Sequence, residues 1–372
     1  MKIAEVRTLA LSGATDDHGW PGGTDPNVQY NTLVEVVSDE GLVGLGSCYT
    51  TRALVEGALD LLKPMLIGQS ALEPQRVSET MRQSTFWLGR GGSVEHAISG
   101  LDIALFDLWG KALGQPVSRL LGGNYRDRIK PYASMLFEDP PLLAEKLNEQ
   151  LARGFRAIKM GWRPFGRVSR KLDELLIKTA RETVGDDVEL MVDAGGSEQF
   201  WPHGVSWARE TAKMLGDWGV VWFEEALKPD DVEGFRQLRA ASPVLVATGE
   251  VLSRRQAFQP FIERRALDII QPDLTKCGGL SEGLRLAWQA YDAGILLVPH
   301  GWNTAVGVAA DLALSAAMPV ARWVEFQVGV PYVEELVLPR FQLDAEGMLR
   351  VPSGPGLGIE WNPEALAKYV KR

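Results

Sequence analysis

Three acidic residues in this chain each stand at the end of a short, apolar segment rich in β-branched side chains. They are Asp193 in VELMVDAGG, Glu224 in VVWFEEA and Glu250 in VLVATGEV. Their residue numbers differ by 31 and 26, about the length of one strand plus one helix in a parallel α/β protein. Acids that recur at this interval meet at the C-terminal mouth of a barrel. Because three converging carboxylates repel one another, the pattern predicts a hard divalent cation among them, usually Mg²⁺.

The same alternation of strand and helix runs through the chain from about Arg128. It gives eight candidate strands, which are 129–134, 157–160, 188–193, 220–224, 244–248, 267–272, 295–299 and 323–326. Amphipathic helices fit between most of them, for example at 168–184 and 207–218. Eight such repeats predict an α/β fold with a closed TIM barrel rather than an open doubly wound sheet. Asp273 in DIIQPDL and His300 in ILLVPHG extend the series of polar residues at strand ends.

The N-terminal part has a different pattern, which predicts an α+β domain. Two strand segments, 31–37 and 42–47, flank a hairpin turn at 38–41, and helical periodicity dominates from 51 to 113. The C-terminal tail is irregular and rich in Gly and Pro, so it does not read as another barrel unit. The expected organisation is a capping domain over 1–125, a barrel over 126–330, and a C-terminal segment over 331–372 that packs back on the capping domain.

Composition limits the partners of the chain. A net charge of −9 argues against nucleic acid or an anionic membrane surface as the main partner. A small anionic substrate remains compatible with this charge, because a bound metal reverses the local field.

Two cysteines, Cys48 and Cys277, give no disulfide framework and are typical of reduced packing residues. Since Met1-Lys2 leads directly into a strand-like segment and no apolar run could span a bilayer, we expect a cytoplasmic protein with no membrane partner.

A series of motifs, in order along the chain, resembles those of the enolase superfamily. The most specific stretch is HAISGLDIALFDLWGKALGQPVSRLLGG, residues 96–123, and WFEEAL, ATGE, QPDLTKCGG and GPGLGIEW follow it. Together they are similar to the mandelate racemase and muconate lactonising enzyme family. The resemblance implies a capping domain built from both ends of the chain over a modified (β/α)₇β barrel. It also implies Mg²⁺-assisted removal of a proton next to a carboxylate.

Within that family, the resemblance implies a role for each strand-end residue. Asp193, Glu224 and Glu250 fall on the three metal-ligand positions. Asp273 and His300 fall on a dyad. In such a dyad the carboxylate accepts from one imidazole nitrogen and leaves the other free to act as a general base near neutral pH.

Two positions indicate the mandelate racemase-like branch. Asp273 stands where the muconate-lactonising branch has a catalytic Lys. Glu325 in RWVEFQ falls where the racemase-like branch places an acid that hydrogen-bonds the substrate carboxylate or its enediolate. Glu225, which follows Glu224, would point away on an extended strand, so we expect Glu224 to be the metal ligand and Glu225 to lie just outside the ligands.

One departure from the family pattern lies at the end of the second barrel strand. Many members carry Lys-x-Lys there, whereas this chain reads Lys159-Met160-Gly161. The missing second Lys often serves as a base on the face of the substrate opposite the dyad, so its loss argues against two-base racemisation. Lys159 could still hold the substrate carboxylate beside the metal as a point charge.

Loops of the capping domain are expected to set specificity for a small-molecule carboxylate. Trp20 in HGWP and Tyr49 in CYTT are the candidate substrate-binding residues. Trp20 could instead anchor another subunit, and the resemblance implies a homo-oligomer, either a dimer or an octamer.

Taken together, these features favour a Mg²⁺-dependent acid-sugar dehydratase. Such an enzyme removes the proton α to a carboxylate via a metal-stabilised enediolate and eliminates the β-hydroxyl to give a 2-keto-3-deoxy acid. His300 could carry out both proton transfers.

The alternative is a racemase, epimerase or cycloisomerase on a hydroxy acid or sugar lactone, with Lys159 acting beside His300. A metal-dependent hydrolase is disfavoured because the four histidines include no His-x-His pair, and the intact set of core residues argues against a non-catalytic binding protein.

Overall fold

Eight parallel strands form the central sheet of the part of the chain that this computed structural model describes, residues 1–12 and 29–371. They are β4 (Arg128–Leu136), β5 (Ala157–Gly161), β6 (Glu189–Asp193), β7 (Val220–Glu224), β8 (Leu245–Thr248), β9 (Ile269–Ile270), β10 (Leu296–Leu297) and β11 (Trp323–Gln327). Their order in the sheet is β10-β9-β8-β7-β6-β5-β4-β11. A parallel bridge between Leu297 and Ala321 joins β10 to the segment that leads into β11, so the sheet curls round as a barrel. The eight strand segments expected from the sequence are confirmed.

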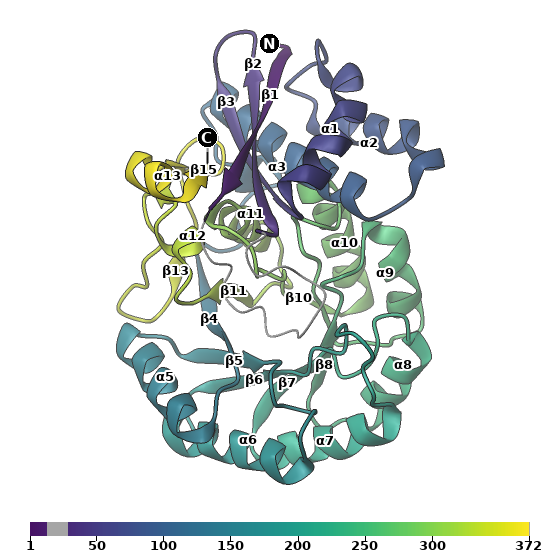
Figure 1. The fold of residues 1–372 in the computed structure, drawn as a ribbon, viewed down its shortest axis with the longest axis vertical. Helices are drawn as coiled ribbons and strands as arrows, with labels where there is room; N and C mark the ends of the chain where they lie inside the picture. Colours follow the sequence, from purple (N-terminus) through teal and green to yellow (C-terminus); the bar gives the residue numbers. More distant parts are fainter. Residues whose placement is uncertain (13–28, 372) are drawn as a thin grey trace.

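One helix connects each barrel strand to the next. These helices are α5 (Pro140–Arg153), α6 (Arg170–Val184), α7 (Val205–Asp217), α8 (Val232–Ala241), α9 (Arg254–Glu263), α10 (Gly279–Ala293) and α11 (Ala305–Ala316). Figure 1 shows α5 to α9 in an arc outside strands β4 to β8. The arrangement is the (β/α)₇β barrel that the family resemblance implies.

Helix α6 shows how local sequence places a helix on the outside of the sheet. The side-chain oxygen of Ser169 caps it by accepting a hydrogen bond from the backbone N–H of Leu172 at 3.2 Å. Its buried residues Leu176, Ile177 and Ala180 recur at helical spacing and face the barrel. Helices cover one face of the strands, and the barrel interior covers the other. The amino-acid sequences of the strands are therefore nearly continuous apolar runs.

A smaller α+β domain covers one end of the barrel. Its elements are β1 (Ile3–Leu11), β2 (Asn31–Ser38), β3 (Val43–Tyr49), α1 (Arg52–Leu66), α2 (Pro74–Ser84), the 3₁₀ helix η1 (Phe86–Leu88), α3 (Ser93–Leu113) and α4 (Val117–Leu120). Strands β1 to β3 form an antiparallel sheet. The turn between β2 and β3 contains Gly41 with a φ of 84°, a left-handed conformation that favours glycine.

The C-terminal segment joins the two domains. It contains α12 (Pro331–Glu334), β12 (Val337–Leu338), β13 (Leu349–Arg350), β14 (Glu360–Trp361), α13 (Pro363–Tyr369) and β15 (Val370–Lys371). Strand β15 pairs with β1 of the capping sheet, and β13 pairs with β4 of the barrel. The indole N–H of Trp361 also donates to Glu35 on β2 at 2.8 Å. The tail therefore completes the capping domain, and Figure 1 shows both ends of the chain at this end of the molecule.

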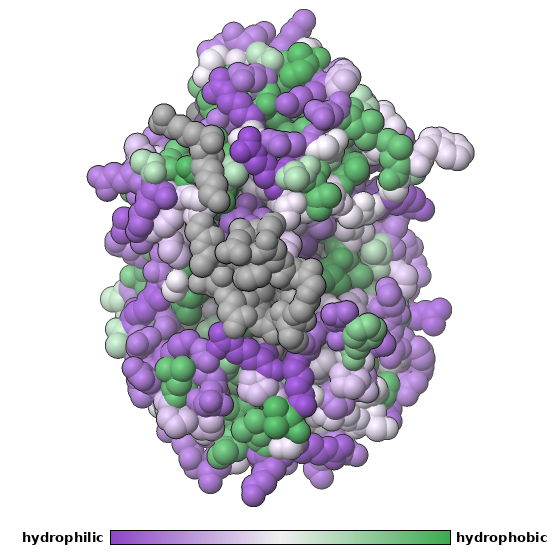
Figure 2. All heavy atoms as spheres, in the orientation of Figure 1, coloured by the Kyte–Doolittle hydropathy of each residue, from purple (hydrophilic) through white to green (hydrophobic). Residues whose placement is uncertain are grey.

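Hydrophilic residues predominate on the molecular face in Figure 2, where hydrophobic ones form scattered groups. Among the described residues, no helix combines the length and apolar character needed to cross a membrane. Cys48 and Cys277 are free and buried.

Helix α3 packs unusually closely on the capping sheet because glycines line the contact. A Cβ added at Gly46 on β3 would lie 2.0 Å from the backbone oxygen of Gly100 on α3. The buried carboxylate of Asp107, also on α3, accepts from the backbone N–H of Leu45 at 2.8 Å and from that of Leu357 in the tail at 2.7 Å. Helix α3 is therefore the element that fastens the sheet and the tail together.

Replacing Gly46 with Ala should lower the melting temperature, because the new methyl group forces α3 away from β3 at a cost of about 1–3 kcal/mol. Gly57→Ala is the matched control. Gly57 is an exposed residue of α1, and nothing lies within 4 Å of a Cβ added there. This control should leave the melting temperature unchanged or raise it, since Ala favours a helix over Gly by up to about 1 kcal/mol. Equal melting temperatures for the two variants in a calorimetric scan would contradict the close packing.

Candidate active site

Side chains that point into the barrel form two successive layers. The lower layer is an apolar cluster made of Tyr132, Ala157, Met191, Trp222, Ala247, Ile269, Val298 and Trp323. Because side chains alternate along a strand, the residues two positions later share the same inward direction. These residues are Ser134, Lys159, Asp193, Glu224, Gly249, Gln271, His300 and Glu325. The upper layer is therefore mostly polar, and it lies at the C-terminal ends of the strands.

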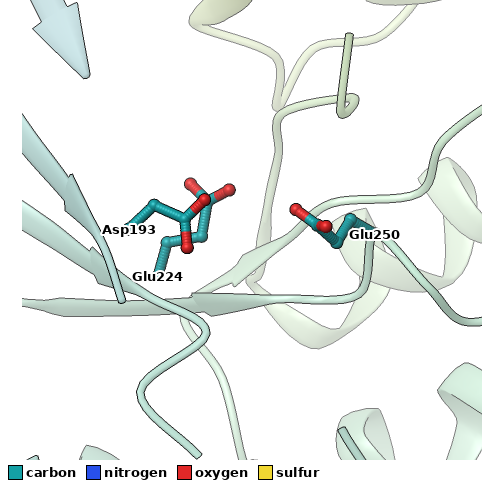
Figure 3. Close-up of side chains that lie close together, drawn as sticks. All are labelled: Asp193, Glu224 and Glu250. Carbon is teal, nitrogen blue, oxygen red and sulfur yellow. The ribbon is translucent and has the colours of Figure 1, made fainter. Parts of the chain in front are cut away.

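Asp193, Glu224 and Glu250, which we call the acid triad, meet at this end of the barrel. Their carboxylate oxygens lie within 4.8 Å of one another, and all three side chains are buried. In Figure 3, Asp193 and Glu224 come from neighbouring strands and Glu250 faces them from the next loop. Burial raises the pKa of Asp193 well above its usual range, and the charges of Glu224 and Glu250 raise it further. A divalent cation between these oxygens would relieve that repulsion.

Two tryptophan indoles hold the acid triad in place. The indole N–H of Trp162 donates to Asp193 Oδ2 at 3.1 Å, and that of Trp222 donates to Glu224 Oε2 at 3.0 Å. The backbone N–H of Gly195 donates to the other oxygen of Asp193 at 2.7 Å. Sequence reasoning did not identify either indole. The available signal was that a buried tryptophan needs a hydrogen-bond acceptor, and Glu224 lies two residues after Trp222.

His300 and Asp273 are in direct contact, with His300 Nδ1 at 2.8 Å from Asp273 Oδ2. The other oxygen of Asp273 accepts from the backbone N–H of Thr275 at 2.7 Å. Burial raises the pKa of Asp273, but Lys276 and the hydrogen bond from His300 lower it to about 2. The ionised carboxylate assigns the imidazole proton to Nδ1. In the neutral imidazole the lone pair is therefore on Nε2, which lies 3.3 Å from Glu250 Oε2, on the side of the acid triad. Burial lowers the pKa of His300, but the charge of Glu250 and the hydrogen bond with Asp273 raise it above its usual value.

Lys159 connects the acid triad to Glu325. Its Nζ lies 2.6 Å from Glu224 Oε1 and 3.0 Å from Glu325 Oε1. Burial lowers the pKa of Lys159, but the charges of these two acids raise it well above its usual range. The second oxygen of Glu325 accepts from the backbone N–H of Gly301 at 2.6 Å. Lys159 is therefore a fixed ammonium with two anionic partners.

The structure also explains the departure at Gly161. A Cβ added at Gly161 would lie 2.9 Å from the Cβ of Asp193. A long side chain at this position would displace a member of the acid triad, so a second lysine does not fit beside Lys159 in this packing. The next residue, Trp162, has a left-handed backbone with a φ of 60° and supplies its indole to Asp193 instead.

Glu225 differs from the expectation of an extended strand. Its φ of 44° is left-handed, because β7 ends at Glu224 and the chain turns there. Its carboxylate accepts from the backbone N–H of Ser197 at 3.2 Å. Burial and the charges of Glu250 and Asp193 raise its pKa well above the usual range. Glu225 therefore lies beside the acid triad without being part of it, although the chain turns at this residue instead of continuing as an extended strand.

A cavity of about 700 Å³ borders these groups and is lined by residues of both domains. Tyr49, a predicted substrate contact, lines it, whereas Trp20 lies outside the described residues. Lys276 and His96 also line the cavity. Neither was singled out as a site residue from the sequence, although the position of Lys276 three residues after Asp273 was a usable signal.

Seven predicted residues are brought together at the barrel mouth. They are Lys159, Asp193, Glu224, Glu250, Asp273, His300 and Glu325. Their contacts create a cluster of acids, a buried ammonium and an imidazole whose Nε2 faces the acids. These groups can bind a cation that prefers oxygen ligands, and they can move a proton next to it.

Comparison with known proteins gives two family matches that together span most of the chain. Residues 142–365 match the model described as Enolase C-terminal domain-like. Residues 24–122 match the model described as Mandelate racemase / muconate lactonizing enzyme, N-terminal domain.

Individual relatives align along almost their whole length. The D-galactarolactone cycloisomerase of Agrobacterium fabrum is 34% identical over 99% of this chain and 99% of its own. The L-rhamnonate dehydratase of Saccharopolyspora erythraea is 31% identical over 98% of this chain and 97% of its own. The crystal structure of the 3,6-anhydro-D-galactonate cycloisomerase from Zobellia galactanivorans is 29% identical and superposes with a TM-score of 0.89, covering 100% of both chains.

Proposed function

This chain belongs to the mandelate racemase / muconate lactonizing enzyme family of the enolase superfamily, and on that premise we propose that it is a Mg²⁺-dependent acid-sugar dehydratase. It would remove the proton α to a carboxylate and eliminate the β-hydroxyl, giving a 2-keto-3-deoxy acid. The observation that carries this proposal is the placement of His300 Nε2, which faces the acid triad at 3.3 Å from Glu250 and borders the 700 Å³ cavity.

The residues of the acid triad fit Mg²⁺. All of their ligand atoms are carboxylate oxygens, which hard cations prefer, and they are buried within 4.8 Å of one another. Asp193, Glu224 and Glu250 would hold the ion. When bound, Mg²⁺ supplies a Lewis acid that polarises the substrate carboxylate and offsets negative charge.

The side chains divide the remaining work. His300 Nε2 takes the α-proton, and Asp273 orients the imidazole and stabilises the imidazolium that forms. Two N–H donors of Lys159 face Glu224 and Glu325, and its third N–H would hold the substrate carboxylate as a point charge. Burial raises the pKa of Glu325, but Lys159 and His300 lower it to about 2, so this acid is ionised in the substrate-free protein. We assign Glu325 to holding Lys159 and Gly301, since it would need a proton before it could donate to the substrate.

A cycloisomerase is the alternative activity, because two of the relatives bear that name. Its first step is the same removal of an α-proton, and it differs in the oxygen that departs. An epimerase would need a second base opposite His300, and Gly161 offers none. Among the described site residues Lys159 is the candidate for that part, and Glu224 and Glu325 already hold it.

A panel of acid sugars incubated with Mg²⁺ should give a 2-keto product from at least one member. Because His300 is the proposed single base, only one α-epimer of that substrate should exchange its α-hydrogen in D₂O, as followed by proton NMR. Exchange of both epimers at similar rates would overturn the one-base assignment and favour an epimerase with Lys159 as second base. Failure of the whole panel to give a 2-keto product would count against the dehydratase.

Glu224→Gln should weaken Mg²⁺ binding by at least about tenfold in a calorimetric titration, since it removes one of three anionic ligands. Glu182→Gln on the outer face of α6 is the matched control, because the Glu182 side chain is 63% exposed. The control should bind Mg²⁺ like the unmodified protein. Equal affinities for the two variants would remove Glu224 from the metal site.

His300→Asn should lose α-proton exchange by about 10²–10⁴-fold, the range expected for a positioned general base. The melting temperature and Mg²⁺ affinity should stay close to those of the unmodified protein. Exchange at the original rate would show that another group is the base.

A further inference from the structure

Lys276 lies at the barrel mouth and has no part in the proton abstraction described above. It follows β9 on the loop that carries Asp273, lines the cavity, and is only 6% exposed. Its Nζ lies 3.5 Å from Asp273 Oδ2, on the oxygen that also contacts His300. The ammonium is therefore on the same side of the cavity as the proposed base.

The capping domain holds this ammonium in place. Nζ of Lys276 lies 4.3 Å from the centroid of the Tyr49 ring, a cation–π contact. The backbone N–H of Tyr49 donates to the carbonyl of Thr275 at 3.3 Å, which fixes the end of β3 against the loop. An ammonium has three N–H donors. With Asp273 on one side and an aromatic face on another, Lys276 retains a donor for a ligand in the cavity.

Elimination of a β-hydroxyl needs a proton at the departing oxygen, and few of the described residues around the cavity can supply one. Burial lowers the pKa of His96 to about 4, so its imidazole is neutral at pH 7. Burial raises the pKa of Tyr49, which makes its hydroxyl a poor acid. Lys159 is committed to Glu224 and Glu325.

We propose that Lys276 is the general acid that protonates the departing β-oxygen, while His300 only removes the α-proton. This role rests on the proposed dehydratase function. The C–H bond at the α-carbon breaks and its proton goes to His300 Nε2. The electron pair left behind expels the β-oxygen, which takes a proton from Lys276 Nζ and leaves as water. The enol then becomes the 2-keto acid by losing its hydroxyl proton and gaining a proton at the β-carbon. His300 returns its proton to solvent, and Lys276 recovers one from it.

Lys276→Met separates these steps when two substrates are compared. One is the acid sugar that the unmodified protein dehydrates, and the other is its 3-deoxy-3-fluoro analogue, whose fluoride leaves without a proton. Formation of the 2-keto acid from the hydroxy substrate should fall by at least about 10²-fold, whereas fluoride release and α-hydrogen exchange in D₂O should each change by less than about tenfold. All rates are taken on the plateau of each variant's pH profile, so that the lost charge near His300 does not enter the comparison.

Lys276→Arg provides a second variant that keeps the positive charge beside Asp273. A guanidinium does not release its proton in proteins, so this variant should show the same selective loss of hydroxide elimination. Lys178→Met on α6 is the matched control, because the Lys178 side chain is 50% exposed. It should behave like the unmodified protein on both substrates.

Two results would overturn the role of Lys276. Unchanged dehydration in both Lys276 variants would show that another group protonates the leaving oxygen. A parallel fall in dehydration, fluoride release and exchange would show that Lys276 acts through Asp273 and His300 instead. Exchange without elimination in the unmodified protein is a different result, which would overturn the proposed dehydration itself.

Discussion

Repulsion among buried carboxylates is the interaction on which the barrel mouth depends. Asp193, Glu224 and Glu250 converge within 4.8 Å, and Lys159 bridges from Glu224 to Glu325 at 2.6 and 3.0 Å. A buried charge that lacks a partner costs several kcal/mol, so these groups can coexist only if cations offset them. Lys159 offsets part of the charge permanently. The remaining negative charge is available to bind a divalent ion. The repulsion among the acids therefore also provides the affinity for the metal.

The second half of the site depends on contact between the two domains. The loop that carries Asp273 and Lys276 is fastened to the capping domain, because Arg82 on α2 donates to the backbone oxygen of Gly278 at 2.6 Å. The Nε of Arg82 also donates to Glu95 on α3 at 2.7 Å. Because Tyr49 contacts the same loop, the capping domain closes the cavity and also sets the position of a cation beside the proposed base.

The sequence predicted the strand-end residues because two periodicities act together. A βα repeat of fairly constant length places Asp193, Glu224 and Asp273 at the same end of the barrel, and the two-residue period of a strand turns Asp193 and Glu224 inward. The indole of Trp162 was missed, and the extended backbone considered for Glu225 is not what the chain adopts. Both residues follow a strand and have positive φ values of 60° and 44°, and alternation has no meaning there.

The amino-acid sequence by itself determined the barrel, the end of it that holds the polar residues, and the set of acids that meets there, because these follow from local periodicity. Only the tertiary structure decided which groups face one another across the cavity. His300 Nε2 lies 3.3 Å from Glu250, and Lys276 lies 4.3 Å from the ring of Tyr49, a residue more than two hundred positions away. Such distances depend on the curl of the sheet and on the docking of the capping domain, and both arise from packing between segments that are remote along the chain.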